Sequence, residues 1–179
     1  MVNTSSINQG PTTASALCQS CGLCCTGVAC GVAIVSPTQD KTFFDLYADS
    51  IIVSDDHGNK RKKAWINQPC PVFDGNCSAY EFRPVDCKTF QCALLEKLMV
   101  GAVDPVSAKS IVDSILGALD KLAVQYNALN EQCLTRDEIF PVLNKLHRGA
   151  VDKASQSAFW RTYPQYLSVR YLIEKHIDK

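Results

Sequence analysis

The chain has 179 residues, and its eighteen basic and eighteen acidic side chains give a formal net charge of zero. This balance gives no electrostatic case for binding nucleic acid or an anionic membrane surface. No apolar run reaches the ~20 residues that a membrane span requires. The chain is long enough to bury a hydrophobic core without help from disulfides, so its ten cysteines need another explanation than a small secreted scaffold.

Residues 1–16 are polar and rich in Ser, Thr, Asn and Gln. They lack the basic and apolar segments of a secretory signal, so we expect a flexible lead-in. Thiols that are not exported stay reduced, and we therefore expect a cytoplasmic protein with free cysteines. We divide the remainder into a cysteine-cluster metal-binding region, 17–101, and a helical bundle, 102–179.

The first elements after the lead-in are short. Residues 18–30 are small and glycine-containing, which is typical of a loop or tight turn around a ligand site. Ser36 and Pro37 predict a helix start, with an N-cap followed by proline at the first helical position. The apolar runs 51–53 and 64–66 flank a polar stretch and predict a β-hairpin.

The C-terminal half is predicted to be helical. Its starts are marked by proline, by an Asp-Pro pair and by a Thr-Glu capping box, and apolar residues repeat at helical spacing. The predicted helices are residues 84–101, a helix from 104 through at least 126, and residues 135–149, 151–162 and 164–179. The fold class that follows is mainly α: a cysteine-rich metal-binding N-terminal region with a small β-hairpin, packed on a C-terminal antiparallel helical bundle.

Eight of the ten cysteines fall into two clusters whose short spacings let successive sulfurs converge on one point. Buried core thiols, disulfides and metal ligands are the three interpretations. Adjacent cysteines have no packing rationale, and disulfides need an oxidising compartment, so we favour metal ligands. The candidate ligands are Cys18, Cys21, Cys24, Cys25, Cys70, Cys77, Cys87 and Cys92.

Geometry limits how these thiols share a metal. Cys24 and Cys25 are adjacent, and consecutive side chains diverge, so both are not expected on one ion. Cys87 and Cys92 would point about 140° apart on an unbroken helix. Cys92 is therefore expected to face a second centre or the core unless its helix begins late. The eight thiolates either share two centres or serve one centre with several bystanders.

The surroundings of the second cluster favour a thiolate. Cys87 lies one turn inside the helix predicted to start at Pro84, whose N-terminal end carries positive partial charge. Arg83 adds to the same field, although a surface salt bridge is its simpler role. Tyr80 and Glu81 are placed to hydrogen-bond a sulfur or the Arg83 guanidinium.

Two separated motifs carry a family resemblance. They read Cys21-Gly22-x-Cys24-Cys25 and Cys70-Pro71-x-Phe73-x-Gly75-x-Cys77-x-x-Tyr80-Glu81-x-Arg83-Pro84-x-x-Cys87-x-x-Phe90-x-Cys92. In order and spacing they closely resemble the YkgJ-type CxxCxxCC family of zinc- or iron-chelating cysteine-cluster proteins. The resemblance covers about residues 18–92 and implies metal binding, without a general catalytic assignment.

Zinc and iron–sulfur are both chemically sound for these ligands. Zinc commonly uses two Cys-x2-Cys knuckles, whereas three cysteines at three-residue steps are closer to the run that holds three corners of a 4Fe–4S cluster. We favour the cluster and keep zinc as the alternative. His57, His147 and His176 lack knuckle spacing and are interpreted as solvated or helix-terminal side chains.

Three function hypotheses follow. The first is a metal-binding protein with an iron–sulfur centre that serves electron transfer, redox sensing or metal handling. The second is a structural zinc module whose bundle binds a protein partner, for which Trp160, Tyr163, Tyr166 and Tyr171 could form a contact surface, although such residues more often pack a core. The third is an enzyme, an iron–sulfur oxidoreductase or its accessory subunit, for which the chain offers no catalytic motif.

Two cysteines lie outside the motifs. Cys30 follows the double cysteine by five residues and could replace one of its neighbours as a ligand. Cys133 is far from both clusters and is interpreted as a buried thiol.

Overall fold

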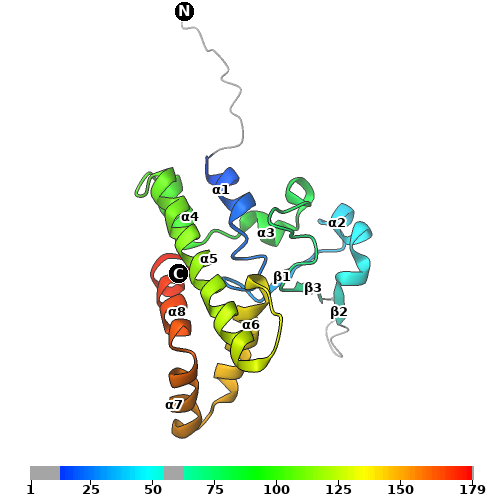
Figure 1. Cartoon of the computed structure of the whole chain (residues 1–179). Coiled ribbons are helices and arrows are strands. Elements are labelled where there is room, and N and C mark those ends of the chain that lie inside the picture. Colours follow the sequence, from blue (N-terminus) through cyan, green and yellow to red (C-terminus); the bar gives the residue numbers. More distant parts are fainter. Residues whose placement is uncertain (1–12, 55–62, 179) are drawn as a thin grey trace, which may run out of the picture.

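The computed structural model describes residues 13–54 and 63–178. Figure 1 shows a group of long helices beside a smaller part that contains a short sheet and shorter helices. The helices are α1 (Thr13–Cys21), α2 (Lys41–Leu46), α3 (Val85–Thr89), α4 (Ala93–Met99), α5 (Pro105–Asn130), α6 (Arg136–Gly149), α7 (Lys153–Thr162) and α8 (Pro164–His176). The strands are β1 (Val32–Ile34), β2 (Ile52–Ser54) and β3 (Lys63–Asn67), and two short 3-10 turns are Ala48–Ser50 and Tyr80–Phe82.

Helix α5 is the centre of the bundle and packs against α6 and α8. It begins where the sequence predicts, because the Asp104 carboxylate accepts hydrogen bonds from the backbone N–H groups of Val106 and Ser107. The capping box of Thr135 and Glu138 is confirmed at the start of α6. The buried residues of α5 recur at helical spacing: Ala108, Val112, Ile115, Leu119, Leu122, Ala123 and Tyr126.

The bundle core extends into the cysteine-rich region. Helices α1 and α4 pack on α5, and Leu23 and Leu94 are buried in the same apolar cluster as the bundle residues. The backbone N–H of Ala93 donates to the carbonyl of Ile177 near the chain's C-terminal end, at 3.1 Å. The predicted class, a mainly helical fold with the cysteine-rich region on a helical bundle, is confirmed.

The three strands form an antiparallel sheet in the order β1-β3-β2, with Ala33 opposite Ile66 and Val53 opposite Ala64. The predicted hairpin is therefore confirmed as β2 and β3, while the polar stretch between them, with His57, lies outside the described residues. Strand β1 was not predicted. The sheet packs over its own small core, which we call the sheet core: Val35, Phe43, Ile51, Ala64, Ile66, Val72 and Ala79.

The start of α2 differs from the prediction. The helix begins at Lys41 after Asp40, rather than at Ser36 and Pro37. The buried Asp40 carboxylate accepts hydrogen bonds from the backbone N–H groups of Ser36, at 2.7 Å, and Val85, at 2.8 Å. Residues 36–40 therefore form a turn that ties α2 to the start of α3.

Two further predictions about helices were wrong. Residues 13–21 form α1, so Thr13–Ala16 are helical rather than a flexible lead-in, and Cys18 and Cys21 lie on a helix rather than a loop. The helix predicted over 84–101 is two helices, because Phe90 adopts an extended conformation (φ −67°, ψ 126°) and Cys92 starts α4 as its N-cap.

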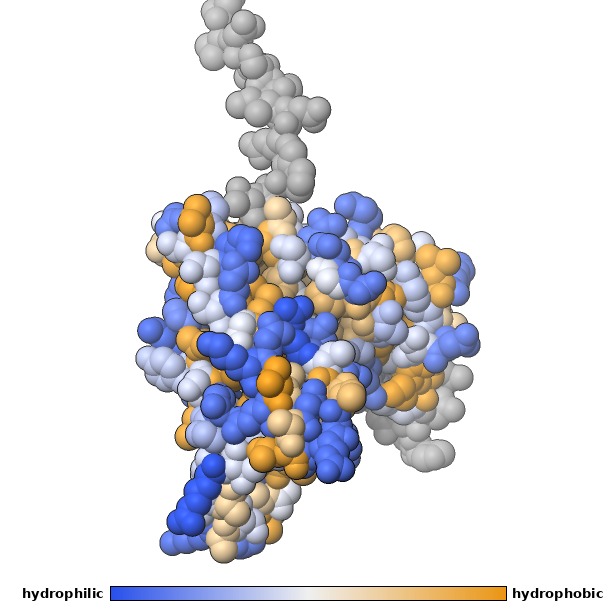
Figure 2. Space-filling view, in the orientation of Figure 1, coloured by the Kyte–Doolittle hydropathy of each residue, from blue (hydrophilic) through white to orange (hydrophobic). Residues whose placement is uncertain are grey.

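The surface seen in Figure 2 is mostly mixed, with hydrophilic residues spread among apolar ones on the bundle and on the sheet side. Within residues 13–54 and 63–178, none of the helices combines the length and apolar character needed to cross a membrane.

Candidate metal centre

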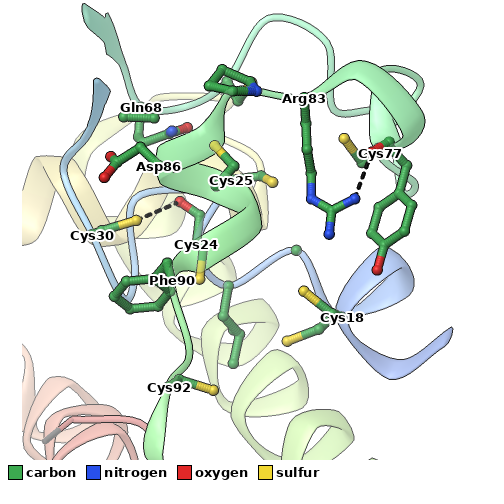
Figure 3. Close-up of a pocket in the computed structure, with 18 of the residues that line it drawn as sticks. Cys18, Cys24, Cys25, Cys30, Gln68, Cys77, Arg83, Asp86, Phe90 and Cys92 are labelled. Carbon is green, nitrogen blue, oxygen red and sulfur yellow. Dashed lines mark hydrogen bonds between the residues drawn. The ribbon is translucent and has the colours of Figure 1, made fainter. Parts of the chain in front are cut away.

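Nine cysteines line one cavity of about 130 Å³ between the sheet side and the bundle, and Figure 3 shows several of their sulfurs turned toward it. All eight predicted ligands are among them, joined by Cys30. The tenth, Cys133, is exposed rather than buried as predicted, and lies between α5 and α6. The cavity cysteines are Cys18, Cys21, Cys24, Cys25, Cys30, Cys70, Cys77, Cys87 and Cys92.

Backbone contacts bring the two cysteine clusters together. The N–H of Cys70 donates to the carbonyl of Cys25 at 2.6 Å, and the N–H of Cys77 donates to the carbonyl of Gln19 at 3.4 Å. Gly22 has a positive φ of 71°, and a Cβ atom there would lie 2.2 Å from the Phe73 ring. Only glycine allows this approach, so the glycine of the first motif and the phenylalanine of the second form one packed contact.

The break after α3 explains why Cys87 and Cys92 both line the cavity. On the unbroken helix of the prediction their side chains would diverge. With the chain extended at Phe90, Cys92 turns back, and its sulfur accepts a hydrogen bond from the N–H of Leu95 at 3.5 Å. The sequence predicted that Cys92 faces a second centre or the core unless its helix begins late, and the helix does begin late, with Cys92 as the N-cap of α4 and in contact with the bundle core.

All ten cysteines are free thiols in the structure, and those of the cavity are half-buried. Burial raises the pKa of Cys21 and of Cys87 to about 12, because a thiolate loses its hydration there. The pKa of Cys25 is raised by burial and then by the neighbouring thiols, Cys70 first. At neutral pH these groups are protonated, so a metal ion that binds them must displace protons.

Cys24 and Cys30 form a coupled pair. The Cys30 thiol lies 3.6 Å from the carbonyl oxygen of Cys24 and donates to it (Figure 3). Hydrogen bonding with Cys30 raises the pKa of Cys24, and burial raises it further, so Cys30 is the first of the two to ionise. Cys30, which the family motif does not include, is thus in contact with Cys24, which the motif does include.

Three backbone N–H groups oppose the effect of burial. Hydrogen bonds from Leu23, Val72 and Ala79 lower the pKa of the cysteine two residues earlier in each case, Cys21, Cys70 and Cys77. A donor aimed at sulfur favours the thiolate form, which is the form that binds metal. The loops therefore supply hydrogen bonds that a bound thiolate uses.

Arg83 lies in the cavity wall, between Cys77 and Cys18 in Figure 3. Its guanidinium carbon is 3.6 Å from the centre of the Tyr80 ring, and its Nη1 donates to the Tyr80 carbonyl. Tyr80 and Arg83 are thus in contact through a cation–π contact and a main-chain hydrogen bond, whereas the Tyr80 hydroxyl donates to the Ser15 carbonyl. The Arg83 Nε is buried without a hydrogen-bond partner. Burial raises the pKa of Cys18 and of Cys77, and the positive charge of Arg83 offsets part of that rise.

The described histidines lie elsewhere. The centre of the His147 ring lies 4.6 Å from the ring centre of Trp160 and 5.3 Å from that of Phe159, among the aromatic residues of the bundle. His176 is at the end of α8, where burial lowers its pKa. Neither residue lines the cavity of the cysteines.

The thiols surround the cavity without forming a closed coordination shell. Across residues 13–54 and 63–178, no three Cys, His, Asp or Glu side chains are already arranged as metal ligands. A metal centre would therefore require the half-buried thiols to turn inward.

A family model matches residues 17–134, which is more than half of the chain, and its family is described as a putative zinc- or iron-chelating domain. The chain belongs to the CxxCxxCC family. The match extends past the cysteine-rich region to include α4 and α5 of the bundle. Searches of curated proteins and of solved structures gave no significant match.

The cavity fits what a CxxCxxCC domain is described as binding. Its ligand atoms are thiol sulfurs, which suit zinc, iron and iron–sulfur clusters. Backbone N–H groups donate to the sulfurs of Cys21, Cys70 and Cys77. The Arg83 guanidinium lies near Cys18 and Cys77. The family and the cavity together support metal binding by this chain.

Proposed function

We propose that this CxxCxxCC chain is a cytoplasmic iron–sulfur protein whose cavity thiols hold a cluster of the 4Fe–4S type, used in electron transfer or metal handling. One observation carries the proposal: the sulfurs of two clusters more than forty residues apart in the sequence line a single cavity. A 4Fe–4S cluster takes four cysteine ligands, and the candidates to supply them are Cys18, Cys21, Cys24, Cys25, Cys70, Cys77, Cys87 and Cys92.

Iron–sulfur chemistry is favoured over zinc by the surroundings of the thiols. Hydrogen bonds to sulfur, nearby charge and partial solvent exposure are the features through which proteins set a cluster's reduction potential. The cavity offers all three, through the backbone N–H groups, Arg83 and the half-buried thiols. When bound, such a cluster supplies one-electron redox chemistry.

A groove of about 710 Å³ beside α3 meets the cavity at Cys18 and Cys87 and would give a redox partner access to the thiols. Phe90, which is 41% exposed, also lines it. The free state of the ten cysteines supports a reducing compartment such as the cytoplasm. The proposed role requires the cluster to exchange electrons with another molecule, and Cys18 and Cys87 line this groove.

A structural zinc site is the second candidate, and the position of the cavity favours it. Cys21 and Cys92 pack against the bundle core, and Cys70 and Cys77 pack against the sheet core. A metal held by thiols from both sides would join two apolar cores that share few other contacts. Structural zinc contributes on the order of 10 kcal/mol to the folding of such sites.

Purification of the full chain without oxygen separates the two candidates. The proposal predicts a brown protein with broad visible absorption, an EPR signal on reduction, and iron and acid-labile sulfide in equal amounts. A colourless protein with stoichiometric zinc would overturn the iron–sulfur proposal in favour of the structural zinc site. A protein that takes up neither metal would overturn both.

A further inference from the structure

We infer that the cavity holds two separate four-thiol metal centres, one against the bundle and one against the sheet, rather than a single centre. The inference rests on the proposed function and divides its ligands. The bundle-side set is Cys18, Cys21, Cys24 and Cys92. The sheet-side set is Cys25, Cys70, Cys77 and Cys87.

The bundle-side set is built on α1 and α4. Cys18 and Cys21 are three residues apart on α1, so their side chains share a face of that helix. Cys92 starts α4, which packs against α1. Cys21 and Cys92 both contact the apolar core of the bundle, which places them on the same side of the cavity.

The sheet-side set is built on the loop after β3 and on α3. Cys70 and Cys77 both contact the sheet core, and the N–H of Cys70 is bonded to the carbonyl of Cys25. Cys87 lies on α3, which packs against β1 and is fixed there by a 2.9 Å hydrogen bond from the N–H of Ile34 to the Asp86 carboxylate. Cys70, Cys77 and Cys87 are therefore carried by segments that pack against the sheet or its core, and Cys25 is bonded to one of these segments.

The adjacent pair Cys24 and Cys25 is the point where the two sets separate. In Figure 3, Cys25 lies on the side of Cys77, and the Cys24 sulfur points toward the side of Cys92. The backbone agrees with this division, because the N–H of Cys70 in the sheet-side set donates to the carbonyl of Cys25 at 2.6 Å. A double cysteine thus supplies one ligand to each centre.

Arg83 stands between the two sets. Figure 3 shows its guanidinium between Cys18 of the bundle-side set and Cys77 of the sheet-side set. Its positive charge favours the thiolate form of both residues. Four thiolates around one divalent ion leave a net charge of about −2 on the centre, so two such centres close together repel each other. A guanidinium with an unpartnered buried Nε is suited to reduce that repulsion.

Cobalt titration of the reduced full chain tests this division, because Co²⁺ bound by thiolates absorbs strongly in the near ultraviolet. We expect saturation at two equivalents per chain. Cys92→Ser and Cys87→Ser should each lower the number of tetrathiolate sites to one, and the double variant should have none. Cys133→Ser is the matched control and should still bind two, and so should Cys30→Ser.

Each outcome decides between the inference and the function on which it rests. Saturation at one Co²⁺ per chain, or at three Co²⁺ ions that share nine thiolates, would overturn the division into two sets. Metal binding by the chain would still stand in both cases. Loss of all binding in either single variant, with helix content by circular dichroism unchanged, would do the same. If the unaltered chain binds no cobalt, zinc or iron, the proposed function itself fails.

Discussion

The bundle and the sheet side differ in what holds them together. The bundle core contains twenty buried apolar residues carried by helices of up to 26 residues. Among the described residues, the sheet core contains seven, of which Ala64 and Ile66 lie on β3, Phe43 lies on α2, and the other four lie on connecting segments. The stabilisation that comes from burying apolar surface is roughly proportional to the buried area. The bundle therefore gains far more of this stabilisation than the sheet side does. The comparison indicates that the bundle folds by packing alone, and that the sheet side depends on its thiols and what they bind.

Removal of the metal should show the difference between the bundle and the sheet side most strongly. Because thiol-bound metal contributes on the order of 10 kcal/mol, we expect the sheet side to lose its structure on chelation while α5–α8 stay helical. Hydrogen exchange, followed by mass spectrometry, should show rapid exchange in β3 and continued protection in α5. Equal loss of protection in both would contradict the difference between the regions.

A cavity in the bundle should affect stability without affecting the metal. Leu119 is 1% exposed and lies in the middle of α5. Leu119→Ala should lower the free energy of unfolding by about 2–5 kcal/mol, because the surrounding core relaxes only partly around the lost side chain. Metal content at a temperature where the variant stays folded should match that of the unaltered chain. Reduced metal content there would show that the two regions are more closely coupled than we infer.

The contact between the motifs can be tested by a matched pair of glycines. Gly22 and Gly75 both have a φ of 71°, but only Gly22 has the Phe73 ring against it. Gly75→Ala should cost about 1–2 kcal/mol for backbone strain alone. Gly22→Ala should cost a further ~1–3 kcal/mol because the ring must move, and it should weaken metal binding. Chemical denaturation and metal titration measure the two effects, and equal effects of both variants would refute the role of the contact.

The smallest expected effect is the pH dependence of the metal-free protein. Burial raises the pKa of Cys21, which packs against the bundle core, from 9.0 to about 12, so the folded metal-free bundle keeps a proton that the unfolded chain loses. Stability should therefore be constant below about pH 9 and should fall as the pH rises toward 12. Metal binding should show the opposite trend and tighten with rising pH, because thiolates are the ligands. Thermal unfolding across pH 7–10.5, with and without zinc, checks the sign of both trends.

The bundle could be predicted because its signals are local. Asp104 and Pro105, and Thr135 with Glu138, mark helix starts through side-chain hydrogen bonds within one turn, and the structure confirms them. The positions of Ile115 and Leu122 follow from helical period alone. Such signals depend on neighbours in sequence, so sequence reasoning reaches them.

The cysteine-rich region was less predictable because its structure depends on distant partners. The start of α2 is set by an Asp40 carboxylate that bonds Val85, 45 residues away. The break at Phe90 has no proline or glycine to announce it. The two cysteine motifs predicted a metal site shared by both clusters, and the structure places the thiols of both clusters on one cavity, but the inclusion of Cys30 and the exposure of Cys133 depend on the fold.

We infer that sulfurs from both cysteine clusters surround a shared site and bind metal there. X-ray absorption at the metal edge, measured on the loaded full chain, tests it most directly. We expect a first shell of four sulfur atoms per metal at about 2.3 Å, with no nitrogen or oxygen. A first shell dominated by nitrogen or oxygen, or an unchanged sulfur count when Cys21 and Cys77 are both replaced by serine, would contradict the account.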